Sequence, residues 1–283
     1  MAEAVLANAI WASTFVFVKL ALAEIGPLTI AGLRYFGGFL LLAPLVARRG
    51  AVRSLPRTAW LRFLFIGLAG YTVGNGALFW GLQHMPSTTG SLMISLTPLP
   101  VLGLSIFWLG EKARRGQIVG LIACIAGSVL FLVPGAGSAG EPIGIGLGVV
   151  ALFSFATFGA LGREAARRRE VDTLSLTALP LALGGGLLLL LALPLEGAPN
   201  FSAQGWAIVL WLAAVNTVLA YLLYNHALKT LTALEMNVLL NLGPIGTALI
   251  AWPLLGERLT TQQLAGMIMV VLGVIAVQAG AER

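Results

Sequence analysis

The residues that could do chemistry in this sequence are polar and aromatic side chains spaced four apart within long apolar runs. Tyr71, Asn75 and Phe79 follow this spacing in residues 60–82, and Ser91 and Ser95 follow it in residues 87–109. A spacing of four places side chains on one face of a helix. Amides and hydroxyls on such a face could hydrogen-bond the ammonium and carboxylate groups of a small solute, while rings cover its apolar part.

The same kind of pattern recurs in other runs and defines a set of candidate substrate-binding residues. These are Asn8, Trp11, Phe15, Tyr71, Asn75, Phe79, Ser91, Ser95, Tyr221, Asn225, Asn237 and Asn241. We predict that they line a cavity inside the protein, because polar groups within a membrane tend to face the protein interior or water. The alternative is that they only join helices through interhelical hydrogen bonds.

Two prolines and two basic residues extend this set. Pro98 and Pro244 each free a backbone carbonyl within a helix, so they could be hinges, or their carbonyls could bind neighbours, water or solute. Lys19 and Arg34 could attract a carboxylate. They could equally snorkel to the lipid headgroups, and snorkelling is the favoured interpretation for either residue alone.

The remaining ionisable residues do not form an enzyme active site. Asp172 is the only aspartate, which excludes a paired-aspartate protease, and the sequence has no Gly-x-Ser-x-Gly, His-Glu-x-x-His or phosphate-binding loop motif. Cys124 is the only cysteine, so no disulfide forms within the chain. His226 could titrate and Glu235 could act as a gate, but helix packing and a solvated helix N-terminus are the simpler interpretations. We expect no cofactor and no metal.

The composition places these residues in a membrane protein. Of the 283 residues 58% are hydrophobic and only 10% are charged, whereas about a quarter are charged in ordinary soluble domains. A bilayer core of about 30 Å needs about 20 apolar residues per helix. Ten runs meet this length: 4–22, 29–47, 60–82, 87–109, 116–134, 143–162, 173–194, 206–228, 233–254 and 262–280. The first run lacks a preceding basic segment, so we predict a membrane helix there rather than a cleaved signal peptide.

The basic residues predict the orientation of the chain. Most of the 17 Lys and Arg residues follow the second, fourth and sixth runs, whereas the loops at 23–28, 134–142 and 195–205 contain none. Cytoplasmic loops carry the excess of Lys and Arg, so we predict a multi-pass membrane protein with both termini in the cytoplasm. The clusters are short and lie between apolar runs, so we expect no nucleic-acid partner.

The two halves of the chain repeat one another at an offset of 146 residues. Gly110-Glu111-Lys112 aligns with Gly256-Glu257-Arg258, and the same offset pairs Asn75 with Tyr221. Each half has five runs, and an odd number makes the second half enter the membrane from the opposite side. The sequence therefore predicts an all-α membrane protein with ten transmembrane helices in two inverted five-helix repeats, an architecture typical of secondary transporters. These repeats span residues 1–137 and 138–283.

With these features the chain resembles the drug/metabolite transporter superfamily, and more narrowly its EamA-type permeases. The resemblance is carried by Leu109-Gly110-Glu111-Lys112, Leu255-Gly256-Glu257-Arg258 and Trp11-Ala12-Ser13-Thr14-Phe15. It implies export of amino acids or related metabolites across a bacterial inner membrane. It also implies that the fifth and tenth helices are peripheral and that the other eight surround a central cavity. One departure is that Phe155 takes the place of Trp11 in the second half.

We therefore expect a secondary transporter that exports small metabolites by alternating access, with neutral or aromatic amino acids as the leading candidates. The stripes contain no Asp or Glu, which suits zwitterionic or neutral solutes. A nucleotide sugar, a drug or another metabolite is the alternative substrate, and a channel or membrane enzyme is the alternative class. The expected partners are the solute and membrane lipid. Coupling to protons and the oligomeric state stay open, with a monomer as the working expectation.

Overall fold

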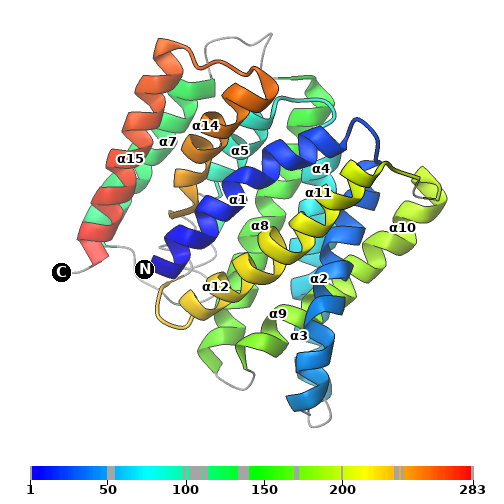
Figure 1. The fold of residues 1–283 in the computed structure, drawn as a ribbon. Coiled ribbons are helices and arrows are strands. Elements are labelled where there is room, and N and C mark those ends of the chain that lie inside the picture. Colours follow the sequence, from blue (N-terminus) through cyan, green and yellow to red (C-terminus); the bar gives the residue numbers. More distant parts are fainter. Residues whose placement is uncertain are drawn as a thin grey trace.

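The computed structural model describes residues 2–49, 55–97, 100–101, 110, 114–132, 140–168, 172–198, 200–232, 236 and 239–281, and these residues form a bundle of helices with no strand (Figure 1). The continuous helices are α1 (Ala2–Ala21), α2 (Pro27–Arg49), α5 (Ser87–Ser95), α7 (Arg115–Leu132), α8 (Pro142–Arg168), α14 (Gly243–Leu255) and α15 (Thr261–Ala281). The start of α1 and the end of α15 lie toward the same end of the bundle.

Three further rods are each interrupted by a π-helical segment, named η. The first runs through α3 (Arg57–Gly67), η2 (Leu68–Asn75) and α4 (Gly76–Gly81). The second is α9 (Thr173–Pro180), η3 (Leu181–Gly185) and α10 (Gly186–Glu196), and the third is α11 (Ala203–Ala213), η4 (Ala214–Leu219) and α12 (Ala220–Ala227). A short 3₁₀ segment, η5 (Leu240–Leu242), precedes α14.

Several of these helices are long and apolar enough to span a membrane. Six of them in the described part of the chain are long and apolar enough to cross a bilayer: Ala2–Ala21, Pro27–Arg48, Arg57–Gly81, Pro142–Arg167, Thr173–Glu196 and Ala203–Ala227. Large apolar side chains such as Leu190 and Leu195 point outward, 68% and 69% exposed, as contact with lipid requires. The all-α membrane fold is confirmed. The number ten stays a prediction, because residues 98–99, 102–109, 233–235 and 237–238 of two predicted runs lie outside the described residues.

Helices α7 and α15 lie side by side at one edge of the bundle (Figure 1). Their backbones approach closely at glycines: a Cβ atom at Gly127 would lie 2.7 Å from the carbonyl oxygen of Gly266, and one at Gly273 would lie 2.7 Å from that of Gly120. Between these contacts the Cys124 thiol donates to the Val270 carbonyl. Small residues are what allow such close packing of membrane helices.

A second close crossing joins α3 to the middle of the α9–α10 rod. A Cβ atom at Gly184 would lie 2.3 Å from the carbonyl oxygen of Gly67. The Thr72 hydroxyl donates to the Gly184 carbonyl at 2.9 Å, next to this crossing. The crossing holds η3 against the rod that contains η2.

Acidic side chains from distant parts of the chain cap the starts of several helices. Glu196 accepts hydrogen bonds from the backbone N–H groups of Leu28 and Thr29, both at 2.8 Å, at the start of α2. Glu24 accepts from the N–H and hydroxyl of Ser202, both at 3.1 Å, just before α11. A carboxylate at a helix N-terminus satisfies free N–H groups and interacts favourably with the helix dipole.

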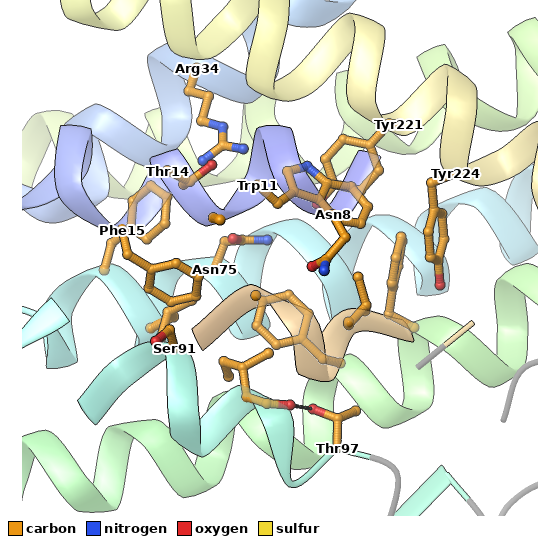
Figure 2. Close-up of a pocket in the computed structure, with 18 residues that line it drawn as sticks. Asn8, Trp11, Thr14, Phe15, Arg34, Asn75, Ser91, Thr97, Tyr221 and Tyr224 are labelled. Carbon is orange, nitrogen blue, oxygen red and sulfur yellow. Dashed lines mark hydrogen bonds between the residues drawn. The ribbon is translucent and has the colours of Figure 1, made fainter. Parts of the chain in front are cut away.

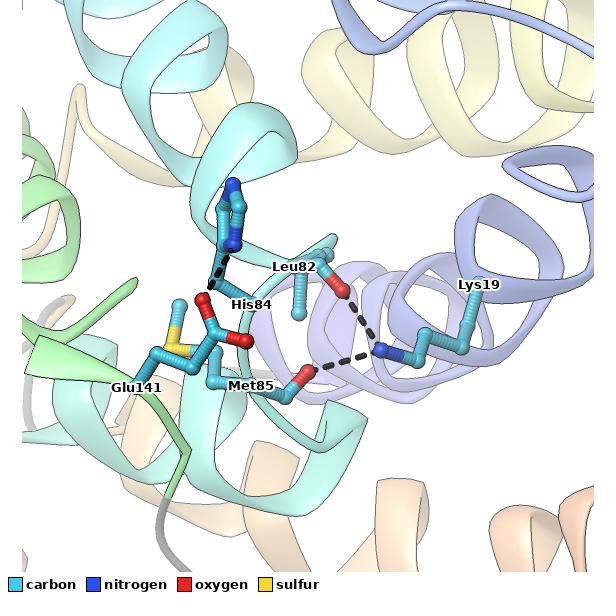
Figure 3. A network of polar contacts seen from close by, with 5 residues as sticks. All are labelled: Lys19, Leu82, His84, Met85 and Glu141. Atoms are coloured by element: carbon cyan, nitrogen blue, oxygen red, sulfur yellow. Dashed lines mark hydrogen bonds and ion pairs between the residues drawn. The ribbon is translucent and has the colours of Figure 1, made fainter. Parts of the chain in front are cut away.

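Several polar contacts surround the turn after α4, at one end of the bundle (Figure 3). The Lys19 ammonium donates to the carbonyl oxygens of Leu82 (2.6 Å) and Met85 (2.9 Å), while His84 Nδ1 lies 2.8 Å from Glu141 Oε2. Lys19 thus binds the last carbonyls of a helix end, which is a favourable place for a cation.

Glu257 joins two distant parts of the chain by hydrogen bonds at this same end of the bundle. It accepts from the hydroxyl of Ser87 at 2.8 Å and from the N–H groups of Ser87 and Thr88, both at 3.2 Å, at the start of α5.

We expect Glu257→Gln to lower the free energy of unfolding by about 2 kcal/mol, because charge-assisted bonds become neutral ones. Thermal unfolding of the purified protein measures this. Glu141→Gln is the matched control: its carboxylate is 67% exposed, so its loss should cost no more than about 0.5 kcal/mol. Equal losses in the two variants would contradict the prediction.

Candidate functional site

A cavity of about 100 Å³ lies in the centre of the bundle (Figure 2). Its walls come from α1, α2, the η2–α4 rod, α5 and the turn after it, α8, α12, η5 and the start of α14. The lining residues are Asn8, Trp11, Ala12, Thr14, Phe15, Arg34, Asn75, Leu78, Phe79, Ser91, Ile94, Thr97, Phe155, Phe158, Tyr221, Tyr224, Leu240 and Gly243. No Asp or Glu is among these described residues.

Several of the residues that the sequence singled out meet at this cavity. Those in its wall are Asn8, Trp11, Phe15, Asn75, Phe79, Ser91 and Tyr221. Tyr71 packs behind the wall, with its ring centroid 4.8 Å from that of Tyr35 and 5.2 Å from that of Tyr221. Pro244 is buried at the start of α14. Pro98, Asn237 and Glu235, and the side chain of Asn241, lie outside the described residues.

Ser95 and Asn225 do not line the cavity, because each is hydrogen-bonded to a neighbouring helix. The Ser95 hydroxyl donates to the Leu92 carbonyl and lies 3.0 Å from the Ser128 hydroxyl of α7. Asn225 Nδ2 donates to the Thr177 hydroxyl of α9 at 2.8 Å. For these two residues the structure favours the alternative that polar groups join helices.

Aromatic rings form most of one wall. The Trp11 centroid lies 4.8 Å from that of Tyr221 in an edge arrangement and 5.2 Å from that of Tyr224. Phe158 stacks on Tyr224 with 16° between the ring planes. Edge and offset contacts of this kind stabilise aromatic clusters beyond simple burial. The wall therefore presents a fixed apolar surface with a few polar groups set into it.

The π-helical segments explain how backbone groups become available beside the cavity. In a π-helix the hydrogen bonds run from i to i+5, and such segments are frequent at functional sites. The Asn216 carbonyl in η4 accepts from Trp11 Nε1 and from Arg34 Nη2, both at 2.9 Å. In η2 the Gly70 carbonyl accepts from Asn75 Nδ2 at 2.7 Å. A periodicity analysis based on 3.6 residues per turn does not detect these segments.

Arg34 is the charged residue of the cavity wall, and the snorkelling interpretation is wrong for it. Its side chain is 2% exposed and points from α2 toward α1 (Figure 2). Nε donates to the Thr217 hydroxyl at 2.8 Å, in addition to the bond from Nη2 to η4. The guanidinium carbon lies 4.9 Å from the Tyr35 ring centroid and 5.7 Å from that of Phe79. Nη1 has no hydrogen-bond partner among the described residues.

The other ionisable residues that the sequence left open lie away from the cavity. Lys19 binds the carbonyls of the turn after α4, as described above. The His226 side chain is 59% exposed and its Nδ1 lies 2.7 Å from Glu3 of α1, so it joins two helices at the surface of the bundle. Within the described parts of the chain, no three His, Cys, Asp or Glu side chains group closely enough to hold a metal ion.

Comparison with known proteins identifies the family. The EamA-like transporter family matches residues 2–133 and, a second time, residues 142–278. The chain belongs to the EamA-like transporter family. The resemblance seen in the sequence is thereby confirmed, and each of the two EamA segments supplies part of the cavity wall: α1, α2, η2, α4 and α5 from the first, and α8, α12 and α14 from the second.

Relatives of this EamA protein are named as transporters without a stated substrate. An uncharacterized transporter of Archaeoglobus fulgidus is 29% identical over 278 residues, covering 94% of this chain and 92% of that protein. The uncharacterized transporter YyaM of Bacillus subtilis is 24% identical and covers 93% and 88%. The uncharacterized inner membrane transporter YedA of Escherichia coli is 25% identical and covers 96% and 88%.

A solved crystal structure shares the fold of this EamA protein. Its TM-score is 0.79 at 19% sequence identity, and the match covers 99% of this chain and 96% of that one. At this identity the likeness shows the fold alone.

Proposed function

We propose that this protein is a secondary transporter that exports small metabolites, with neutral or aromatic amino acids as its leading substrates. The observation that carries the proposal is the central cavity, whose wall combines amides, hydroxyls and aromatic rings from both EamA segments. A site built between two homologous halves can open to one side or the other as the halves rock, which is how many secondary transporters work.

We also propose that the two EamA segments form an inverted repeat of five helices each, with both termini in the cytoplasm. The contact between α7 and α15 supports this arrangement. Gly120 and Gly127 are related to Gly266 and Gly273 by the offset of 146 residues, and Gly127 packs on Gly266 while Gly120 packs on Gly273. Such a self-complementary contact is what a two-fold axis produces.

A second pair of equivalent contacts supports the same repeat. Lys19 binds the Leu82 carbonyl within the first half, and Arg163 binds the Leu228 carbonyl within the second half. Leu82 and Leu228 are 146 residues apart. Each half would then have a cation from its first helix at the end of its third, on opposite faces of the membrane.

The chemistry of the wall supports a solute with a small polar head and an apolar or aromatic body. Asn8, Asn75 and Ser91 supply hydrogen-bonding groups, and Trp11 and Tyr221 supply apolar surface. A multiply phosphorylated solute such as a nucleotide sugar needs several cations, and Arg34 is the single cation among the described lining residues. A nucleotide sugar or drug is therefore the weaker candidate, and a channel or an enzyme is weaker still.

Uptake of radiolabelled amino acids into proteoliposomes tests the proposal. We expect saturable flux of neutral or aromatic amino acids above that of protein-free liposomes. Repeating the measurement with an imposed pH gradient distinguishes facilitated transport from proton coupling. Absence of flux for every amino acid would reject this substrate class, and nucleotide sugars and drugs would then be tested in the same vesicles.

A further inference from the structure

The cavity wall contains a buried cation, Arg34, and no acidic side chain among the described residues pairs with it. Arg34 is 2% exposed and its Nε and Nη2 donate only to neutral groups, the Thr217 hydroxyl and the Asn216 carbonyl. Nη1 has no hydrogen-bond partner in the described part of the chain. The described residues that line the cavity include no carboxylate. Burying an unpaired charge is strongly unfavourable, so an anionic group that enters the cavity would be stabilised there.

The two existing bonds of Arg34 fix the direction of the free part of its guanidinium. Nε and Nη2 are tied to η4, which holds the planar group beside the cavity, and the close rings of Tyr35 and Phe79 restrict its rotation. The guanidinium has five N–H donors in a rigid fork. Nη1 is buried and has no partner among the described residues, so its N–H groups can donate to a carboxylate oxygen that approaches it.

We propose that Arg34 binds the carboxylate group of the transported solute through Nη1. The inference rests on the proposed transport function and names the chemical class of its substrate, a monocarboxylate with an apolar or aromatic body. The body of the solute lies against Trp11 and Tyr221 in this arrangement, and the ammonium of an amino acid faces ring surfaces and amide oxygens. One cation balances one carboxylate, which disfavours dicarboxylates and phosphate esters.

A purely structural role for Arg34 is the competing explanation. Its bonds to Thr217 and Asn216 already join α2 to η4, but this role uses only Nε and Nη2. A purely structural role also predicts that the protein binds acids no more tightly than their amides. Ligand selectivity therefore separates the two explanations.

The test measures ligand-induced thermal stabilisation of the purified full-length protein in detergent. The probes share one side chain: phenylalanine, 3-phenylpropionate, phenylalanine amide and phenethylamine, with alanine and alanine amide as a smaller pair. We expect the carboxylates to stabilise the wild type and the amides and amine to have little effect. Arg34→Met should weaken apparent carboxylate affinity at least about 30-fold. Lys229→Met removes an exposed cation outside the cavity and should keep wild-type affinity.

Arg34→Lys keeps the charge but replaces the planar guanidinium with an ammonium, so it gives a second test if Arg34→Met does not fold. We expect it to lose affinity for carboxylates specifically. Wild-type affinity in a folded Arg34 variant, equal binding of acid and amide, or no stabilisation by any carboxylate would each overturn the inference. Proteoliposome flux is read separately. Selective binding without flux would reject the transport function and leave the carboxylate site standing.

Discussion

Gly184→Ala should lower the free energy of unfolding by about 3 kcal/mol, the upper part of the range for overpacking a well-packed interior. A Cβ atom at this position would lie 2.3 Å from the Gly67 carbonyl oxygen and 2.9 Å from its Cα. Both are backbone atoms, so no side-chain rotation relieves the contact and the two rods must separate. Thermal unfolding of the purified protein and its yield as a single species measure the effect.

Gly186→Ala, two residues further along the same rod, is the matched control. The nearest atoms to an added Cβ there belong to the Phe36 ring, at 3.5 Å, which is an ordinary contact. Alanine is favoured over glycine in a helix by about 1 kcal/mol, so this variant should unfold at or above the wild-type temperature. If the two variants unfold at the same temperature, the crossing at Gly67 does not limit the packing of these rods.

Asn75→Ala should reduce the transport rate per folded molecule about 10-fold. Asn75 lines the cavity and its Nδ2 is bound to the Gly70 carbonyl within η2. The substitution removes the side-chain oxygen from the cavity and loosens a π-helical turn. Loss of about one hydrogen bond to the solute corresponds to roughly this factor. Initial rates of uptake into proteoliposomes, normalised to protein content, measure it.

Asn225→Ala is a close control because it removes the same kind of side chain, an asparagine amide, from the other half of the chain. Asn225 is also buried and hydrogen-bonded, but its partner is Thr177 and it does not line the cavity. We expect it to lose stability and to keep the transport rate per folded molecule. Equal rates for Asn75→Ala and Asn225→Ala would remove Asn75 from the site.

Tyr221→Ala should lose transport as well. Comparison with Tyr221→Phe shows how much of the transport rate depends on the hydroxyl rather than on the ring.

The positions of the helices could be predicted well because each membrane segment is an apolar run of about 20 residues between glycines, prolines or charges. The ends were less predictable where a helix continues beyond its apolar part. The apolar run predicts a helix over residues 143–162, whereas α8 extends to Arg168. Hydropathy marks the part of a helix in the bilayer, whereas the basic turn after Gly162 is helical but water-compatible.

The cavity could be predicted only in part from the helical period. The stripe of Asn75 and Phe79 does reach the cavity, but on α12 the residues that line it are Tyr221 and Tyr224, three apart, and not Asn225, four after Tyr221. Spacings of three and four both lie on one face of a helix, so the pattern alone does not choose between them. Hydropathy favours snorkelling for Arg34 because it indicates how deep a residue lies in the membrane but not which way its side chain points. Its acceptors in η4 are more than 180 residues away in the chain, and only the folded structure brings them together.

The glycine contact between α7 and α15 also constrains how the protein is made. α7 begins at Arg115 and α15 begins at Thr261, so the ribosome completes α7 long before its partner helix exists. During that interval the backbone at Gly120 and Gly127 has no helix to pack against, and lipid chains must cover it. Insertion of the last helix is therefore the step that seals this edge of the bundle. A chain released before Thr261 would leave the backbone at Gly120 and Gly127 facing lipid.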